Sequence, residues 1–357
     1  MLATFHAGSI SGNLSWIEDA LARQEQPVPV TILAARPRTG LIGLAAAAVA
    51  ALRAGWLLAT SRLFIVDDYF FPMYVIRPRR GTRFVQTWHA CGAFKRFGYG
   101  LRQRSFGADE ATVAAYPIHT NYSVCLVSAQ RFAPIYAEAF RQPLDRFTST
   151  IGIPRTDLFF DEPRQAQAIT AIRGRYGISS SDRVILYAPT FRGASTTAAR
   201  APDGLNLETL RRSLGQDHVI LVRQHPFVRA QPVATAGPRS FAMEVSDWPD
   251  INELMLVSDV LITDYSSAMY EFSLLGRPMI FFAPDHADFE RERGLYFDYR
   301  TGVPGPVFET TEEVARYLRA GVFDLERVAR FRAESFEVAD GHASERFVDR
   351  IVVPALR

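Results

Sequence analysis

Apolar and polar positions along this 357-residue chain alternate between short hydrophobic runs and longer, mixed segments. In the first 150 residues, short β-rich runs predict four strands, at 28–34, 63–66, 83–87 and 124–128. Segments of helical length and composition lie at 13–22 and 41–58. Strands that alternate with helices predict a parallel sheet covered by helices on both faces.

The second half repeats this alternation. Its buried runs predict strands at 183–187, 219–223, 260–263 and 278–282. The predicted helices are 207–214, 250–258, 267–275, 311–320 and 343–351. A polar zone at 161–182 predicts a linker followed by a helix between the two halves.

Two such halves predict an α/β protein with two Rossmann-like domains facing a cleft, the glycosyltransferase-B arrangement. We expect domains at 1–160 and 161–357, with the last helix packing back onto the N-terminal domain. Ligands of such sheets bind beyond the carboxyl ends of the strands, so candidate chemistry is sought in the loops there.

The longest apolar stretch, 41–59, has nearly the length of a membrane span but is rich in alanine and contains Arg53. A charge at mid-bilayer costs about 2.5 kcal/mol or more, so the stretch predicts a buried helix rather than a span. The first residues lack the pattern of a secretion signal. With only two cysteines, Cys91 and Cys125, no disulfide framework is expected. A cytoplasmic protein is therefore predicted.

Composition adds one uneven feature. The chain is 48% hydrophobic and 22% charged with a net charge of +2, as expected of a globular protein. Segment 69–108, however, contains no acidic residue. Its cations are Arg77, Arg79, Arg80, Arg83, Lys95, Arg96, Arg102 and Arg104. Its interleaved aromatic residues include Phe70, Phe71, Phe94, Phe97, Tyr99 and Phe106. This segment predicts contact with an anionic surface, and the alternative is a solvated basic face.

The first candidate motif follows the strand predicted at 83–87 and runs from Trp88 through His89 and Gly92 to Lys95, the only lysine of the chain. An imidazole exposed at a strand end can accept a proton from an attacking hydroxyl near neutral pH. The lysine supplies a point charge suited to phosphate. A purely structural histidine is the alternative from this motif alone.

Two further motifs follow strands in the second half. Pro189, Thr190 and Arg192 come after one strand, and a guanidinium there can bind an anion through several N–H donors. After the next strand, the sequence Arg223-Gln224-His225 ends at a proline, which restricts His225 to extended backbone angles. Polar surface loops are the alternative.

In the fourth motif a buried strand leads into Asp264-Tyr265-Ser266-Ser267, where a helix is expected to begin. One serine would cap the helix, and the free N–H groups with a second hydroxyl suit a pyrophosphate. Glu271, one turn into the helix, is placed to meet a polar donor group. An ordinary capped helix would leave one serine unused.

Together, from about residue 67 to 348, these motifs closely resemble the CDP-glycerol glycerophosphotransferase family. Its hallmarks are matched by Val66-Asp67-Asp68-Tyr69, by the Trp88-His89-x-x-Gly92-x-x-Lys95 stretch, by Gly152-Ile153-Pro154-Arg155-Thr156-Asp157, by 187–192, by His225-Pro226, by Asp264-Tyr265-Ser266-Ser267 and by 340–346.

The resemblance implies transfer of a glycerol phosphate or related polyol phosphate from a CDP-linked donor, CDP-glycerol or CDP-ribitol, to a lipid-linked or glycan acceptor. It implies catalysis by His89 and His225 without a cofactor, and the absence of an Asp-x-Asp triplet predicts no obligatory metal. It also implies a donor-binding C-terminal domain and an enzyme peripheral on the inner face of the membrane. The substrate-binding residues implied or favoured by the motifs are Trp88, Ala90, Cys91, Gly92, Lys95, Arg155, Pro189, Thr190, Arg192, Arg223, Gln224, Asp264, Ser266, Ser267 and Glu271.

The sequence departs from the polymerising members in three respects. Ala90-Cys91 stands where those members commonly have Gly-Thr, Glu271 stands where they often have Asp, and their long N-terminal extension is not expected here. These departures predict a short, primase-like or single-transfer enzyme in cell-wall teichoic acid or capsule synthesis.

Two other classes share some of these features. A glycosyltransferase or a nucleotide-sugar epimerase would have the same double sheet. A non-enzymatic module that binds anionic lipid or polymer would explain the basic segment but not the two histidines and the paired serines. Nucleic-acid binding is disfavoured by the nearly neutral net charge.

Overall fold

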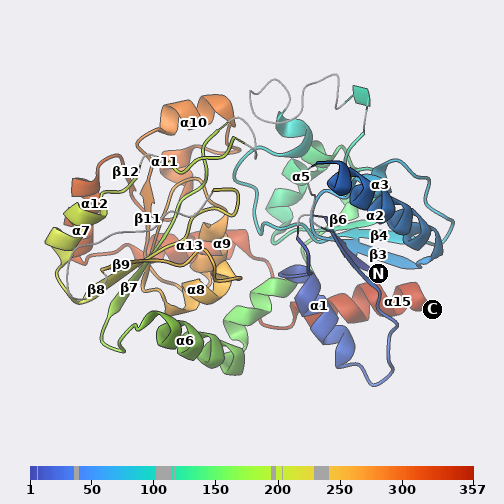
Figure 1. Ribbon diagram of the computed structural model, residues 1–357, viewed down its shortest axis with the longest axis horizontal. Coiled ribbons are helices and arrows are strands. Elements are labelled where there is room, and N and C mark those ends of the chain that lie inside the picture. Colours follow the sequence, from blue (N-terminus) through green and yellow to red (C-terminus); the bar gives the residue numbers. More distant parts are fainter. Residues whose placement is uncertain are drawn as a thin grey trace.

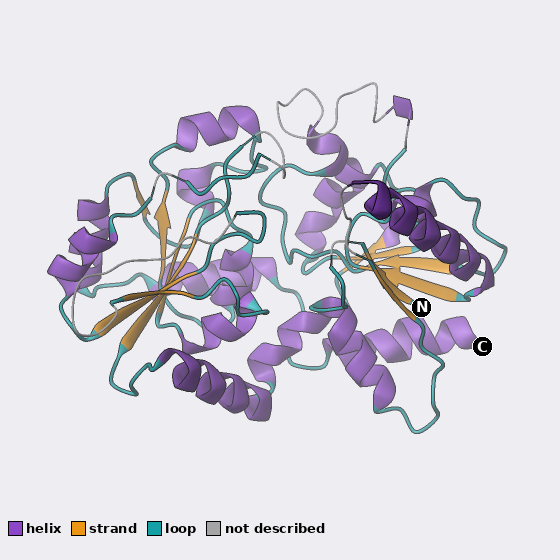
Figure 2. Cartoon of the chain, in the orientation of Figure 1, coloured by secondary structure: helices purple, strands orange, loops and turns teal. Residues whose placement is uncertain are grey.

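The computed structural model describes residues 1–5, 7–35, 40–101, 114–115, 117–193, 198–202, 204–228 and 241–357, without the side chains of 40–42 and 44. The chain has an α/β fold with two six-stranded sheets, one in each half, that lie side by side (Figures 1 and 2). Every strand pair in both sheets is parallel.

The N-terminal sheet has the strand order β2-β1-β3-β4-β5-β6. Its strands are β1 (Leu2–Thr4), β2 (Ile32–Ala34), β3 (Leu63–Val66), β4 (Arg83–Gln86), β5 (Val124–Leu126) and β6 (Phe147–Thr148). All four residues of β3 are buried, as expected of a parallel strand with both faces covered. The main helices of this half are α1 (Asn13–Ala22), α2 (Gly40–Thr60), α3 (Phe71–Tyr74) and α5 (Ala133–Phe140).

The C-terminal sheet has the strand order β12-β11-β10-β7-β8-β9. Its strands are β7 (Arg183–Ala188), β8 (His218–Val222), β9 (Ala242–Glu244), β10 (Val260–Thr263), β11 (Met279–Phe282) and β12 (Val307–Phe308). The helices include α7 (Leu207–Leu214), α8 (Ile251–Val257), α9 (Ala268–Ser273), α10 (His286–Glu292), α11 (Tyr299–Gly302), α12 (Thr311–Ala320) and α13 (Leu325–Ser335).

The polar zone between the sheets is mostly one helix, α6 (Glu162–Tyr176). Asp161 caps its first turn by accepting a hydrogen bond from the Arg164 N–H. Gly177 ends it in a left-handed conformation with φ 64°, which glycine adopts without steric cost. The predicted linker and helix are therefore a capped, well-formed connection.

The end of the chain lies against the N-terminal half. Helix α14 (Ala343–Phe347) and the π-helical turn η5 (Val348–Val352) contact α1, and α14 also contacts the 3-10 helix η4 (Pro154–Phe160). The carboxylate of Asp157 accepts hydrogen bonds from the N–H groups of Ala343 and Ser344, at 2.9 and 2.8 Å. The last helix, α15 (Val353–Leu356), lies beside the N-terminal sheet in Figure 1.

Two sequence predictions need correction. The strand predicted at 28–34 is only Ile32–Ala34, and the short strands β1, β6, β9 and β12 were not predicted, because two or three residues give no recognisable alternation. The apolar stretch at 41–59 does form a helix, but it is not buried throughout, since Val49, Leu52 and Trp56 are exposed. None of the helices among the described residues is long and apolar enough to cross a membrane.

In each sheet the strand order reverses direction once, between β1 and β3 in the first and between β7 and β10 in the second. Loops that leave neighbouring strands at such a point diverge, and the crevice between them is where ligands of open parallel sheets bind. The loops after β7 and β10 contain Thr190 and Ser266. The topology thus brings two of the predicted motifs to one edge.

Candidate active site

A cleft of about 310 Å³ lies between the two halves and is lined by residues from both. Seven of the predicted site residues line it: Trp88, His89, Arg155, Arg223, Ser266, Ser267 and Glu271. Asn13 and Asp67 from the N-terminal half and Asp250 and Asn252 from the C-terminal half line it too. The sequence placed Asp67 in a family motif without a role in the site. It gave no signal for Asn13, Asp250 and Asn252, because they are common polar residues that only the fold brings together.

His89 stands on a turn that its neighbours hold in an unusual conformation. Trp88 is buried and has φ 55°, a left-handed angle that bulky residues rarely adopt. Its N–H donates to Oε1 of Gln86 and its carbonyl accepts from Nδ2 of Asn13, each at 2.8 Å. The His89 side chain that follows is 48% exposed at the edge of the cleft. Strain of this kind is typical of functional sites, where the surrounding structure enforces it.

A carboxylate lies beside the His89 ring. Oδ1 of Asp68 is 3.5 Å from Nδ1 of His89. A proton on Nδ1 is favoured by this neighbour, which leaves Nε2 as the basic nitrogen of the neutral ring. Asp68 is itself held in place, because its carbonyl accepts from Nε2 of Gln86 at 3.0 Å.

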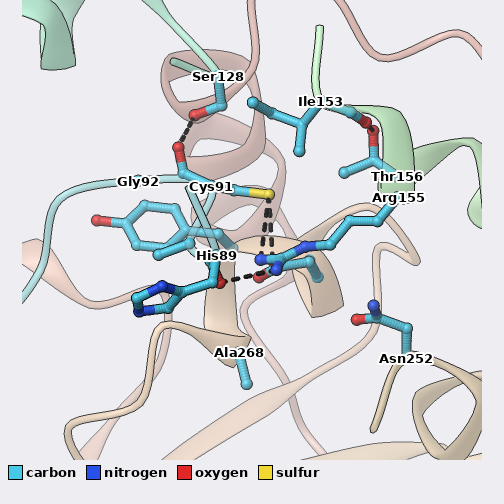
Figure 3. Close-up of polar contacts among 12 residues, drawn as sticks. His89, Cys91, Gly92, Ser128, Ile153, Arg155, Thr156, Asn252 and Ala268 are labelled. Carbon is cyan, nitrogen blue, oxygen red and sulfur yellow. Dashed lines mark hydrogen bonds and ion pairs between the residues drawn. The ribbon is translucent and has the colours of Figure 1, made fainter. Parts of the chain in front are cut away.

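A buried ion pair crosses the cleft behind His89 (Figure 3). The Arg155 guanidinium donates to the carbonyl of His89 at 2.7 Å and pairs with Oε1 of Glu271 from α9. Burial alone would lower the pKa of Arg155, but the Glu271 carboxylate raises it above its ordinary value. Arg155 therefore stays charged and connects the His89 turn to the opposite half.

Cys91 belongs to the same cluster but does not line the cleft. It is fully buried, and its thiol donates to Oε1 of Glu271 at 3.1 Å. Burial and the Glu271 charge raise the pKa of Cys91 well above its ordinary value, so it remains a thiol. The residue was predicted to bind substrate, whereas here it orients the carboxylate that faces the cleft. Ala90 and Gly92 likewise do not line the cleft, and Gly92 packs against the Tyr270 ring with no room for a side chain.

Lys95 reaches a second group of cations because the halves exchange backbone hydrogen bonds. The Arg96 N–H donates to the carbonyl of Gly294 at 3.1 Å, and the Tyr296 N–H donates to Phe94 at 3.0 Å. This pairing places Lys95 near Arg293, a residue that the sequence motifs did not single out. Burial, followed by the charge of Arg293, lowers the pKa of Lys95 to about 8. Among the described residues, no hydrogen bond or ion pair to the Lys95 ammonium is formed.

His225 lies in the same neighbourhood and is held neutral. Burial, then Lys95 and Arg293, lowers its pKa to about 3. Its ring packs against Phe191 and Phe227, with centroids 4.7 and 4.9 Å away. Nδ1 accepts from the Phe227 N–H at 3.3 Å, so the proton of the neutral ring is on Nε2. This histidine is thus a hydrogen-bond donor at every pH near neutrality.

Arg192 and Asp264 form a buried network instead of an open anion site. The Arg192 guanidinium pairs with Oδ2 of Asp264 at 2.9 Å and with both carboxylate oxygens of Asp285. Thr190 donates its N–H and its hydroxyl to Oδ1 of Asp264, at 2.8 and 2.9 Å. The donors of Arg192 are therefore occupied, which argues against the predicted direct grip on a phosphate. Pro189 begins this loop, and Arg192 shapes it.

The paired serines have different surroundings. Oγ of Ser266 accepts from the Ala268 N–H at 3.2 Å, whereas Ser267, the residue before α9, makes no side-chain cap. Both line the cleft. After β8, the Arg223 guanidinium donates to the carbonyls of Trp248 and Pro249, and the Gln224 N–H donates to Oγ of Ser246 at 2.7 Å. Gln224 does not line the cleft.

Metal ligands are not grouped near the site. Across the described ranges, no set of three or more histidine, cysteine, aspartate or glutamate side chains is placed to hold a metal ion. The site instead combines a histidine paired with a carboxylate, a neutral histidine that donates, and several cations. Such a cleft suits an enzyme that transfers an anionic group.

Comparison with known proteins identifies the family. Residues 1–353 match the family described as CDP-glycerol:poly(glycerophosphate) glycerophosphotransferase, and the chain belongs to that family. It is 34% identical over 98% of its length to a teichoic acid ribitol-phosphate primase of Bacillus spizizenii, covering 90% of that protein. It is 35% identical to a teichoic acid poly(ribitol-phosphate) polymerase of the same organism, of which it spans 54%. The resemblance predicted from the motifs is confirmed, and the chain is an enzyme.

Solved structures agree on the fold. The wall teichoic acid polymerase TagF superposes with a TM-score of 0.77 at 23% identity, covering 99% of this chain and 88% of TagF. A UDP-GlcNAc 2-epimerase from Neisseria meningitidis gives a TM-score of 0.52 at 12% identity, covering 99% of this chain and 98% of that one. The epimerase alternative thus has a distant likeness in fold and no support from the family.

Proposed function

We propose that this enzyme transfers a polyol-phosphate unit from a CDP-linked donor to a hydroxyl of a lipid-linked or glycan acceptor and releases CMP. The observation that carries the proposal is the placement of His89, backed by Asp68, across a cleft from Ser266, Ser267 and their helix. A base on one side and anion donors on the other are what an acceptor hydroxyl and a pyrophosphate need.

In the proposed reaction, Nε2 of His89 takes the proton of the acceptor hydroxyl as its oxygen attacks the β-phosphorus of the donor. The new O–P bond forms while the bond from that phosphorus to the bridging oxygen breaks, and CMP leaves with the electron pair. Charge that develops at phosphorus is met by Lys95, Arg293 and the Nε2–H of His225. Each acts as a fixed donor or charge, which lowers the barrier without itself reacting.

We assign the remaining predicted residues to positioning rather than to contact. Arg155, Cys91 and Glu271 fix the turn before the base, since one of the Arg155 N–H groups holds the carbonyl of His89. Arg192 and Asp264 shape the loop after β7. The donor would occupy the C-terminal side of the cleft.

The proposed architecture is two Rossmann-like domains of the glycosyltransferase-B type. The order β9-β8-β7-β10-β11-β12 is that of a doubly wound dinucleotide-binding sheet, which supports this assignment. We propose a boundary near residue 160, with α14, η5 and α15 returning to the N-terminal domain, as their contacts with α1 and η4 support.

Ribitol phosphate is the polyol phosphate that the relatives favour. The ribitol-phosphate primase is 34% identical over 98% of this chain, whereas a glycerol-phosphate primase of Bacillus subtilis is 26% identical over 84%. We propose a primase-like, single-transfer reaction at the inner face of the cytoplasmic membrane, in teichoic acid synthesis.

Release of CMP tests the function directly. The enzyme is incubated with CDP-ribitol, CDP-glycerol and, for comparison, UDP-GlcNAc, each with and without a lipid-linked acceptor. Acceptor-dependent CMP release with one of the CDP-polyols, and transfer of its labelled phosphate, is the expected result. Epimerisation or sugar transfer from UDP-GlcNAc, with neither CDP-polyol consumed, would replace the proposal by the alternative.

A further inference from the structure

The middle of the basic segment 69–108 lies inside the molecule and not on an outer surface. Two of the aromatic residues expected to meet an anionic surface, Phe70 and Phe94, are buried in the core. Cys91 and Gly92 are buried as well. Three further residues of that prediction lie outside the described part of the chain: Arg102, Arg104 and Phe106. The buried part of the segment is therefore explained by what it contacts within the protein.

One side of the turn that carries Gly92 is held to the N-terminal half. The Tyr136 hydroxyl, from α5, donates to the carbonyl of Gly92 at 3.0 Å. The Ser128 hydroxyl, which follows β5, donates to the carbonyl of Cys91 (Figure 3). The same turn includes His89, so these hydrogen bonds keep the imidazole at a defined place in the N-terminal half.

The other side of the turn rests on the ring of Tyr270, from α9 in the C-terminal half. Tyr270 is only 1% exposed. Phe132 of the N-terminal half meets its ring edge to face, and Phe331 of α13 stacks on it, with centroids 5.7 and 5.1 Å away. A side chain on Gly92 would place its Cβ 2.2 Å from Cζ of Tyr270. Carbon atoms cannot approach so closely, so any residue other than glycine would force the turn or the ring to move.

The ring of Tyr270 makes these contacts, and its hydroxyl takes no part in them. The hydroxyl oxygen is buried and has no hydrogen-bond partner among the described residues. Burial raises the pKa of Tyr270 above its ordinary value, so the phenol stays protonated. An unpaired buried hydroxyl destabilises a folded protein. Tyr270 therefore contributes through the packing of its ring.

Gly92 and Tyr270 are close to the two groups that the proposed reaction has to bring together. Gly92 comes three residues after His89, and Tyr270 comes three residues after Ser267. Between the two backbones lies one aromatic ring and no other side chain atom from Gly92. The thickness of this contact thus fixes how far the imidazole stands from a phosphate held by Ser267.

We propose that Gly92 and Tyr270 are positioning residues that set the separation between His89 and the donor phosphate. Glycine lets the backbone of the turn rest directly on the ring, and the ring is the spacer. Attack on phosphorus needs the acceptor oxygen about 3–3.5 Å from it, and a misplacement of about 1 Å can lower the rate on the order of a hundredfold. Gly92, which the motif predicted to bind substrate, acts through His89 instead. The inference rests on the proposed function.

A compensating pair of substitutions tests the spacing. Gly92→Ala should lower turnover on the order of tenfold to a hundredfold, because the added methyl group pushes the His89 turn away from α9. Tyr270→Leu should lower turnover as well, because leucine lacks the outer ring atoms Cε1, Cε2 and Cζ that support the turn. In the double variant the methyl group enters the space left by those atoms. Its turnover should exceed that of Gly92→Ala by about threefold or more, as expected for residues in direct contact.

Two further measurements separate positioning from a general loss of stability. CMP release is measured below the melting temperature of every variant and is expressed per folded molecule. Calorimetry measures the affinity for the CDP-polyol. In Gly92→Ala, kcat should fall while the dissociation constant of the donor changes by less than about twofold, because the donor contacts of the C-terminal half are untouched. Tyr270→Phe, which keeps the ring, should retain turnover and gain stability, since the unpaired hydroxyl is removed.

Gly305→Ala is a matched control. A Cβ at Gly305 would lie 2.1 Å from the carbonyl oxygen of Met279, which is as severe a clash as the one at Gly92. Met279 begins β11, so the clash lies at the amino ends of the strands and away from the cleft. This variant should melt at a lower temperature and keep normal turnover per folded molecule.

Three results would overturn the inference. The first is normal turnover of folded Gly92→Ala, and the second is a double variant in which the two single losses simply multiply. The third is an equal loss in Tyr270→Phe and Tyr270→Leu, since the hydroxyl and not the ring would then matter. If Gly92→Ala does not fold, this third comparison still decides. Failure of the proposed function is distinguishable, because the unchanged protein would then consume neither CDP-polyol, whereas failure of the positioning inference leaves the unchanged protein active.

Discussion

At the scale of single residues, His89 and Asp68 are expected to act as a pair. His89→Ala should lower turnover on the order of a hundredfold or more, because the attacking hydroxyl loses its base. Asp68→Asn should lower turnover less, because the amide no longer favours the proton on Nδ1 that leaves Nε2 as the base. His218→Ala, at the amino end of β8 opposite the cleft, is the control. Normal turnover of His89→Ala at an unchanged melting temperature would remove it from the mechanism.

His225 should behave differently from His89. Its pKa of about 3 keeps it neutral throughout the working range, so it contributes a donor and not a charge. His225→Ala should cost about a hundredfold in turnover, while His225→Gln, whose amide can donate in place of Nε2–H, should recover part of it. Steady-state kinetics of both variants, with melting temperatures, provide the measurement. If both variants lost the same amount of turnover, His225 would transfer a proton rather than only donate a hydrogen bond.

Lys95 predicts how donor binding depends on pH. Its pKa is lowered to about 8, so the ammonium is charged below that pH and loses its charge as the pH rises through it. Affinity for an anionic CDP-polyol should therefore be greatest below about pH 8 and fall above it, with uptake of a proton on binding. Calorimetry at several pH values measures both quantities. Lys95→Arg should flatten the dependence, since arginine stays protonated.

The sequence indicated the type of chemistry better than it indicated which side chains contact one another in the site. His89 and Lys95 follow a recognisable strand, and His89 lines the cleft, whereas Lys95 does not. The surroundings of Arg192 were not predictable, because its partners Asp264 and Asp285 lie 72 and 93 positions further along the chain. Arg293 lacked any motif, and only the backbone pairing of 94–96 with 294–296 places it at the site.

At the scale of elements, the start of α9 tests the donor site. Ser266→Ala removes the acceptor of the Ala268 N–H and should lower the melting temperature. Ser267→Ala removes a hydroxyl that caps nothing, so it should weaken CDP-polyol binding without affecting stability. The double variant should bind more weakly but still measurably, because the backbone N–H groups remain. Calorimetry measures the affinity of the unchanged protein and the three variants for the CDP-polyol. Equal affinities would show that the pyrophosphate does not bind at the start of α9.

Elements with strong patterns were predicted well, and those without were not. Strand β10 was recognised because its residues are apolar and buried on both faces. The three-residue strand β1 pairs with both β2 and β3, so the sheet and not its own sequence makes it a strand. The same reasoning applies to α2: its composition indicated a helix, but which side is covered depends on the rest of the fold.

At the scale of the whole molecule, the way the halves meet could not be read from the sequence. Arg155 and Glu271 are 116 positions apart, and the polar character of each is unremarkable by itself. Oδ1 of Asn13 accepts a hydrogen bond from the backbone N–H of Arg155 at 3.0 Å. This bond and the Arg155–Glu271 pair connect α1, the His89 turn and α9. Parallel strands predicted the edges where ligands bind, but only the assembled molecule shows which side chains face each other.

The Arg155–Glu271 pair predicts a separation of stability from activity. Their side chains are 14% and 3% exposed, so removing one leaves a buried charge without its counterion. Arg155→Met and Glu271→Met should each cost about 3 kcal/mol or more of unfolding free energy. The double variant should recover most of that loss, because replacing both members of a buried pair by apolar residues is often nearly neutral. Turnover should not recover with it, since the Arg155 guanidinium N–H that holds the His89 carbonyl is absent.

Urea unfolding and CMP release are measured on the unchanged protein, the two single variants and the double variant. Arg164 and Asp19, which form a surface ion pair at 2.7 Å, provide a control whose removal should cost about 1 kcal/mol or less. If turnover of the double variant returned in step with its stability, the pair would contribute only to folding, and the His89 turn would be positioned by Gln86 and Asn13 alone.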